Sequence, residues 1–228
     1  MSKGARLLEV IACSVADAVE AEQGGAGRLE IVSDLSRGGM TPPVALVEQI
    51  VSAVTIPVRV MLRESDGYEV KNGAEKDRLC NAARHLSKLG IDGLVLGFVR
   101  SGNVDVRLTQ KLLACAPSLR ATFHHAFEEL DPMLAIPQIR EIKQVDRILT
   151  YGGAGSWSTK VENLLRYQQL AGPEIKIIAG GGLDAEKIAD MASKTLISEF
   201  HVGRAARVSD DVNSQVNASR VKELLAAF

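Results

Sequence analysis

The stretch RLLEVIACSVADAVEAEQGGAGRLEIV, residues 6–32, holds one complete strand–helix–strand pattern and indicates how the rest of the chain is built. Its two ends are short runs rich in leucine, isoleucine and valine, as in strands that are buried on both faces. Between them, Ser14 followed by Asp17 predicts the start of a helix, and Gly24 and Gly25 predict its end. The first turn, ACSVAD, has no glycine, whereas a doubly wound nucleotide-binding sheet usually carries GxGxxG there.

The same unit recurs along the whole chain. The eight predicted strands are residues 6–12, 28–32, 56–62, 93–98, 119–125, 146–152, 175–181 and 198–203. A helical pattern follows each of them; for the second helix we expect Thr41 as the N-cap and Pro42 as the first helical residue. Eight strand–helix units predict an α/β fold, a (β/α)8 TIM barrel, with residues 1–228 as a single domain.

Composition excludes several classes of partner. The chain has 46% hydrophobic and 24% charged residues with a net charge of −1, which gives no electrostatic footprint for nucleic acid or an anionic membrane. No apolar run approaches the roughly 20 residues that span a bilayer. The cysteines Cys13, Cys80 and Cys115 form neither a CxxC pair nor an even set, so we expect no disulfide framework. These features predict a cytoplasmic protein that binds neither nucleic acid nor membranes.

Polar residues within the apolar strands are candidates for a functional site, because the carboxyl ends of barrel strands carry the chemistry in this fold. Strand alternation places one set of them on the face that we expect to point inward. That set is Glu9, Glu30, Arg63, His124, Thr150 and His201. A buried charge must pair, meet solvent in a pocket or hold a ligand. We therefore predict a site made of two carboxylates, a guanidinium and two imidazoles, namely Glu9, Glu30, Arg63, His124 and His201.

Two alternatives stay open for these residues. An ion-pair network around Arg63 would fill a polar layer of the barrel without any functional role. The neighbouring His125 falls on the opposite face from His124, against a helix or loop, and is expected to be structural.

A second candidate site lies after the last two strands, in AGGGLDAEKI and HVGRA. In many barrels these two loops bind a phosphate through backbone N–H groups. The residues predicted to bind an anion are Gly181, Gly182, Gly203 and Arg204. The alternative is that the glycines only make a tight turn.

The motifs LLEV, EQGGAGRLEI, GGMTPP, IPVRVMLR, DGLVLGF, ATFHHAF, DRILTYGG, AGGG and EFH occur in an order and spacing that resemble the CutC copper-homeostasis family, from about Leu7 to about Arg204. The resemblance implies a TIM barrel, a cytosolic protein associated with copper handling, and a homo-oligomer (dimer or tetramer). It supports the same five site residues. Family members proposed to bind copper have cysteines where this chain has Ile11 and Val32, which offer no lone pair to Cu(I).

Two functions follow from these residues, and the absence of both thiol positions favours an organic ligand. One is a barrel that handles a small-molecule or metal ligand at its C-terminal mouth in copper homeostasis. The other is an enzyme, an isomerase, epimerase or lyase, acting by acid–base chemistry on a small anionic or phosphorylated substrate. Glu9 or Glu30 would then be the base, His124 or His201 the acid, and Arg63 the anion clamp. No ligand-spacing motif such as HExxH is present, so the sequence assigns no cofactor and no metal ligand.

Overall fold

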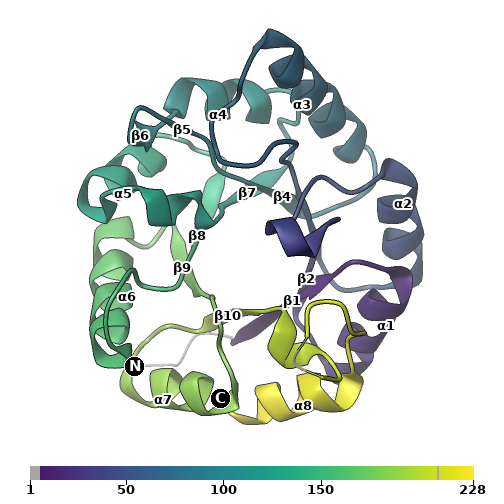
Figure 1. Ribbon diagram of the computed structural model, residues 1–228, viewed down its shortest axis with the longest axis vertical. Helices are drawn as coiled ribbons and strands as arrows, with labels where there is room; N and C mark the ends of the chain where they lie inside the picture. Colours follow the sequence, from purple (N-terminus) through teal and green to yellow (C-terminus); the bar gives the residue numbers. More distant parts are fainter. Residues whose placement is uncertain (1–5, 210) are drawn as a thin grey trace.

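The computed structural model describes residues 6–209 and 211–228, and eight of its strands close into a parallel barrel (Figure 1). Around the barrel the strands follow the order β1-β10-β9-β8-β7-β4-β3-β2. Their bounds are β1 (Leu7–Ala12), β2 (Arg28–Ile31), β3 (Val58–Met61), β4 (Gly93–Leu96), β7 (Arg120–Phe123), β8 (Val145–Thr150), β9 (Lys176–Ala179) and β10 (Glu199–Val202). Every predicted strand is found, and the predicted TIM-barrel fold is confirmed.

Helices form an outer ring around the strands in Figure 1. In the described part of the chain they are α1 (Val15–Gly24), α2 (Val44–Ala53), α3 (Gly73–Leu86), α4 (Val106–Leu113), α5 (Pro132–Arg140), α6 (Trp157–Ala171), α7 (Ala185–Lys194) and α8 (Ala218–Ala226). Shorter elements are the 3-10 turns η1 (Leu35–Arg37), η2 (His125–Glu129) and η3 (Arg204–Ala206), and a small ribbon of β5 (Val99–Arg100) and β6 (Asn103–Val104). The sequence did not predict this ribbon, which lies between β4 and α4.

Capping residues fix where the helices begin. Ser14 accepts a hydrogen bond from the N–H of Asp17, and Gly25 ends α1 in the left-handed conformation, both as predicted. The predicted start of the next helix at Pro42 is wrong, because α2 begins at Val44. The Thr41 hydroxyl instead donates to the carbonyl of Arg63 at 2.9 Å and accepts from its N–H at 2.8 Å. Thr41 therefore connects this loop to Arg63, two residues after the end of β3.

Charged side chains, rather than apolar ones, fill part of the barrel interior. Arg28 pairs with Glu9 and, at 3.4 Å, with Glu199; Arg147 also pairs with Glu199, at 2.7 Å. Arg59 pairs with Asp146 at 2.8 Å. The alternative of an ion-pair network around Arg63 is wrong, because Arg63 forms no ion pair with the described residues. The network is built on these three arginines instead. Removing one partner of such a buried pair leaves an uncompensated charge in the interior and costs about 3–5 kcal/mol.

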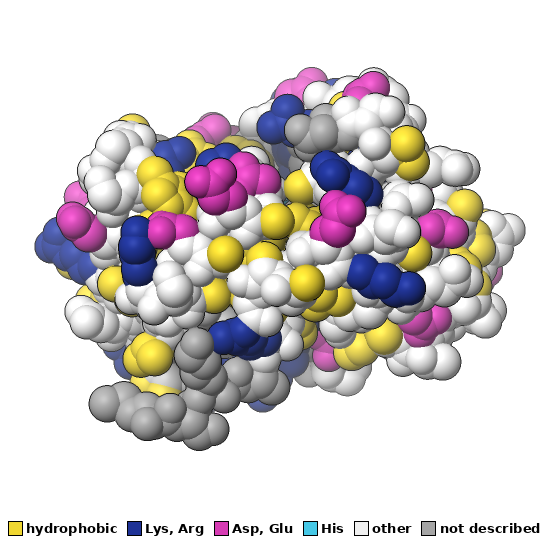
Figure 2. Space-filling view, turned by 90° about the horizontal axis from the view of Figure 1, so that it is seen from below, with side chains coloured by type: hydrophobic (Ala, Val, Ile, Leu, Met, Phe, Trp, Pro, Cys, Tyr) yellow, Lys and Arg dark blue, Asp and Glu magenta, His cyan; other side chains and the backbone are white. Residues whose placement is uncertain are grey.

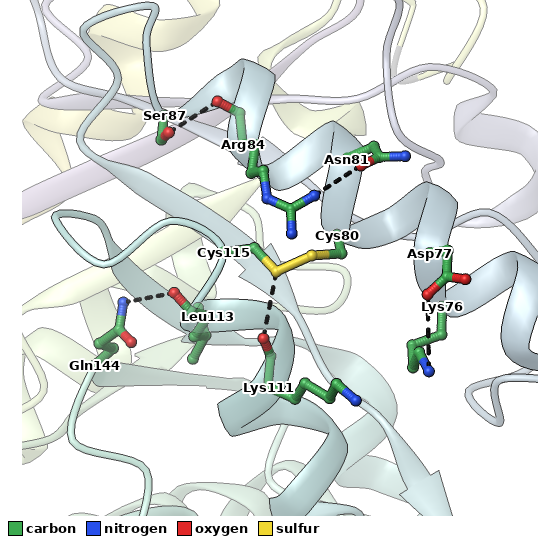
Figure 3. Close-up of a disulfide and its surroundings, with 10 residues drawn as sticks. All are labelled: Lys76, Asp77, Cys80, Asn81, Arg84, Ser87, Lys111, Leu113, Cys115 and Gln144. Atoms are coloured by element: carbon green, nitrogen blue, oxygen red, sulfur yellow. Dashed lines mark hydrogen bonds and ion pairs between the residues drawn. A yellow bond between two sulfur atoms is a disulfide. The ribbon is translucent and has the colours of Figure 1, made fainter.

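A disulfide joins Cys80 on α3 to Cys115, which follows α4 (Figure 3). Their Cα atoms are 5.7 Å apart. The prediction of no disulfide is wrong, because the pairing results from the packing of α3 beside α4 and not from a spacing motif. Cys13, the third cysteine, is free and half-buried.

The outer surface mixes both signs of charge. On the face of Figure 2, which carries α7 and α8, basic and acidic side chains are interspersed with apolar ones. Within the described residues, no helix combines the length and the apolar character needed to cross a bilayer.

Candidate functional site

A cavity of about 410 Å³ opens at the carboxyl ends of the barrel strands, with η1 reaching over the barrel centre in Figure 1. Four of the five predicted site residues line it: Glu30, Arg63, His124 and His201. Glu9, the fifth, is fully buried and contacts His201. The structure thus brings all five to one end of the barrel, although they come from distant parts of the chain.

The deepest part of the site is a carboxylate–imidazole–carboxylate group. Neighbouring strands position it, since β1 lies between β2 and β10 and pairs Glu9 with His201 in register. The Nδ1 atom of His201 lies 2.8 Å from Oε1 of Glu9 and 3.4 Å from Oε2 of Glu30. The other ring nitrogen of His201, Nε2, makes no hydrogen bond with the described residues and belongs to a ring that lines the cavity.

The two carboxylates have opposite pKa shifts. Burial raises the pKa of Glu9, but the charge of Arg28 and the hydrogen bond with His201 outweigh it and lower that pKa below its usual range. Burial raises the pKa of Glu30 to about 7, and the negative charge of Glu9 adds to this effect. Burial lowers the pKa of His201, yet the charges of Glu30 and Glu9 bring it above its usual value. At neutral pH, Glu30 can therefore both release and take up a proton.

Arg63 is a cation at the mouth without a carboxylate partner among the described residues. Its Nε donates to the carbonyls of Ser65 and Gly67, and its Nη1 donates to those of Arg37 and Gly39, over 3.1–3.4 Å. Its Nη2 makes no hydrogen bond within the described chain. The side chain is 9% exposed and lines the cavity. Backbone carbonyls thus hold the guanidinium in place while its charge remains available to an anion.

Tyr68 connects Arg63 with His124. The guanidinium of Arg63 lies 4.9 Å from the centre of the Tyr68 ring, a cation–π contact, and the imidazole of His124 lies 5.1 Å from it. Tyr68 also lines the cavity. The sequence did not single it out, because it follows β3 in a loop where strand alternation carries no information.

His125 also lines the cavity, so the prediction that it lies on the opposite side is wrong. The strand β7 ends at Phe123, and His125 begins η2. Alternation between faces therefore stops before the histidine pair. The Nδ1 atom of His125 is enclosed without a hydrogen-bond partner in the described chain, and burial lowers its pKa to about 4.

The inward position predicted for Thr150 is also wrong, and Leu149 lines the cavity instead. The register between β7 and β8 shifts between Ala121 and Thr122, which moves the following residues of β8 to the other face. The Thr150 hydroxyl donates to Glu128 at 2.6 Å.

The four residues predicted to bind an anion, Gly181, Gly182, Gly203 and Arg204, all line the same cavity. Gly181 and Gly182 have φ angles of 81° and 77°, which favour glycine. Arg204 is exposed and forms no ion pair with the described residues. Lys187 also lies at this rim, but it pairs with Asp184 at 2.8 Å. Arg204 is therefore the cation here that is free to contact an anion.

A metal ion is the other ligand that these groups could hold. One donor atom each from Glu9, Glu30 and His201 lie within 4.8 Å of one another. Oxygen and imidazole donors suit Zn²⁺ or Mn²⁺ rather than Cu(I). Ile11 and Val32, for which the resemblance implies cysteines in copper-binding members, both line the cavity and offer no donor. Cys13 lines a separate cavity, with its sulfur 3.7 Å from Nη2 of Arg207.

Comparisons with known proteins agree with the motifs. The model of the CutC family matches residues 6–206. The "copper homeostasis protein cutC homolog" of Mus musculus is 35% identical over 221 residues, which cover 94% of this chain and 79% of the mouse protein. A family protein CutC of Xylella fastidiosa is 31% identical over 204 residues, covering 89% of this chain and 76% of that protein.

A solved structure extends the comparison to three dimensions. The crystal structure of the protein CutC of Streptococcus agalactiae superimposes with a TM-score of 0.79 at 26% identity. The match covers 87% of this chain and 98% of that one. The resemblance found from the motifs is thereby confirmed in its extent and in its fold.

Proposed function

The chain belongs to the CutC family, and from this premise we propose that its barrel binds a small organic anion at the C-terminal mouth and transfers a proton on it. One observation carries the proposal. Arg63 lines a cavity of about 410 Å³ and, within the described residues, has no carboxylate to neutralise it. A buried cation without a counter-ion is costly, so an anionic ligand that neutralises it gains affinity.

Two further residues of the same cavity, Glu30 and His201, support the proton transfer. Glu30, with a pKa of about 7, changes its charge in the range where a general base works best. His201 is oriented by Glu9 through one nitrogen and has the other available for a ligand. Glu30 would take the proton and His201 would stabilise the charge that develops.

The proposal is tested by thermal shift with phosphate, pyruvate, succinate and glycerol phosphate, since a ligand that binds the folded state raises the melting temperature. Arg63→Gln should abolish the shift. Arg78→Gln is the matched control, because Arg78 pairs with Glu64 outside the cavity and its loss should leave the shift intact. An unchanged shift in Arg63→Gln would contradict the proposal. Exchange of ligand C–H for deuterium in deuterium oxide, lost in Glu30→Gln, tests the proton transfer.

Metal handling is the second candidate, favoured by the close donor atoms of Glu9, Glu30 and His201 and by the copper-homeostasis names of the relatives. The donor set does not fit Cu(I), which prefers sulfur ligands. Equilibrium dialysis against Zn²⁺, Mn²⁺ and Cu(I), followed by elemental analysis, separates the candidates. Stoichiometric metal that is lost in His201→Gln but kept in His85→Gln would favour metal handling over the organic anion.

We also propose a cytoplasmic location and a homo-oligomer of two or four chains, as the family resemblance implies. Disulfides are usually reduced in the cytoplasm, so the redox state of Cys80 and Cys115 in cells tests the location. Sedimentation of the purified protein tests the oligomer.

A further inference from the structure

His124 has a fixed tautomer. Its Nδ1 accepts a hydrogen bond from the N–H of Ala126 at 3.1 Å, so Nδ1 carries no proton. A neutral imidazole has one N–H, which must then be on Nε2. Burial lowers the pKa of His124 to about 3, and the positive charge of Arg63 adds to this effect. His124 is therefore an uncharged hydrogen-bond donor at neutral pH and not an acid.

The imidazole is also held in one place. A Cβ atom on Gly97 would lie 2.8 Å from Nδ1 of His124, so the backbone after β4 approaches the ring closely. The rings of Tyr68 and Phe123 contact it at centroid distances of 5.1 Å and 6.4 Å. His124 is 4% exposed and lines the cavity, and its Nε2 makes no hydrogen bond within the described chain.

Arg63 and His124 present two different donors to the same cavity. Both pack against Tyr68, and Nη2 of Arg63 is the guanidinium nitrogen without a hydrogen bond among the described residues. The guanidinium is charged and suits a carboxylate. The Nε2–H of His124 is uncharged and suits a carbonyl oxygen, on which negative charge develops when a neighbouring carbon loses a proton.

We propose that Arg63 and His124 together select an α-keto carboxylate, with the carboxylate on Arg63 and the keto oxygen on the Nε2–H of His124. This inference rests on the proposed function and names its substrate class. The reaction it supports is enolisation. The C–H bond next to the keto group breaks, its proton moves to the Glu30 carboxylate, and the electron pair moves to the keto oxygen, which remains hydrogen-bonded to His124. Return of the proton reverses the step.

Matched pairs of probes test the selection. Pyruvate against propionate, and α-ketoglutarate against glutarate, differ in the keto oxygen. Calorimetric titration of the full chain should show the keto acid binding about tenfold more tightly in each pair, as one added hydrogen bond allows.

Two variants of His124 separate its roles. In His124→Asn the side-chain oxygen can still accept from Ala126, but no donor reaches the position of Nε2, so the preference should disappear. In His124→Gln the amide nitrogen extends to that position, so the preference should be largely kept. Nitrogen NMR of the wild type should show His124 in the Nε2–H form throughout the pH range of stability.

The outcomes of these experiments separate the keto selection from the proposed anion binding. Equal binding of keto and non-keto acids that still depends on Arg63 overturns the keto selection and leaves the proposed anion binding intact. If no probe binds, both are overturned. A His124 that titrates near its ordinary pKa, or that carries its proton on Nδ1, overturns the inference on structural grounds.

Discussion

The Nδ1 atom of His201 lies 2.8 Å from Oε1 of Glu9, and Arg28 binds the other oxygen of the same carboxylate. Glu9 therefore takes part both in the candidate site and in the ion-pair network of the barrel interior. It orients an imidazole of the candidate site, and it anchors the ion-pair network inside the barrel. Glu30, on the neighbouring strand, lines the cavity and has no arginine partner among the described residues.

This difference predicts unequal effects of the two matched substitutions. Glu9→Gln leaves Arg28 with a weakened, buried ion pair, so the free energy of unfolding should fall by about 3–5 kcal/mol. Glu30→Gln replaces a carboxyl group that is half protonated at neutral pH, so it should lower the free energy of unfolding by less than about 1 kcal/mol, or raise it, while abolishing the proton transfer. Urea denaturation of both variants at pH 7 measures this. Equal losses of stability would contradict the separation of roles.

Glu30 also predicts a pH dependence of stability. Its pKa is raised from 4.5 to about 7 in the folded protein, so between these values the folded state holds a proton that the unfolded state has lost. The contribution of Glu30 to the free energy of unfolding is therefore fully present below pH 4.5 and is lost as the pH rises towards 7. This pKa shift of Glu30 corresponds to a decrease of about 3 kcal/mol in the free energy of unfolding.

The control for this prediction is Glu30→Gln, which removes the titrating group and keeps Glu9, Arg28 and His201. The free energy of unfolding of the wild type should fall relative to this variant as the pH rises, and should be parallel to it above pH 8. A wild type that gains stability relative to Glu30→Gln over the same range would show a lowered pKa instead.

Strand alternation predicted much of the site because Glu9, Glu30 and His201 lie within regular parallel strands. It failed wherever the ladder is irregular or ends. The register shift beside Thr122 turns Thr150 away from the cavity. Because β7 ends at Phe123, alternation between faces no longer applies to His125.

The interior charges illustrate a second limit. Arg28 lies two residues before Glu30 on the same strand, and therefore on the same face, but the sequence does not show whether a residue near the start of a strand is buried or exposed. Arg59, in β3, lies four residues before Arg63, which is again an even spacing. Only the closed barrel shows that both arginines are almost fully enclosed, at 2% and 1% exposure.

Substitutions of the two adjacent histidines, His124 and His125, should differ clearly in their effect on the free energy of unfolding. His124→Phe leaves the buried N–H of Ala126 without its acceptor, which should cost about 1–3 kcal/mol. His125→Phe removes a nitrogen that has no partner within the described residues, so less than about 1 kcal/mol should change. Urea denaturation of the two variants checks this. A larger loss for His125→Phe would mean that its Nδ1 has a partner, such as an ordered water molecule.

The disulfide predicts a redox dependence of stability. Cys80 and Cys115 are 35 residues apart in the sequence, and closing a loop of this length stabilises the folded state by about 2–4 kcal/mol. The oxidised protein should therefore unfold at a higher urea concentration than the Cys80→Ser, Cys115→Ser double variant. Reducing agent should lower the midpoint of the wild type alone. Alkylation under non-reducing conditions should label Cys13 only; three labelled cysteines would contradict the bond.

Tight Cu(I) binding should require cysteines at the mouth of the barrel, where this chain has Ile11 and Val32. Ile11 and Val32 line the cavity and pack in one cluster with Met61, so cysteines at both positions would place two thiolates beside a thioether. The Ile11→Cys, Val32→Cys variant should therefore retain stoichiometric Cu(I) through dialysis, whereas the wild type should not. Ile11→Ser, Val32→Ser is the matched control, since its hydroxyl groups are hard ligands of similar size. Tight, stoichiometric Cu(I) in the wild type, measured by elemental analysis, would show that other groups of the mouth bind copper and would weaken the case for an organic anion.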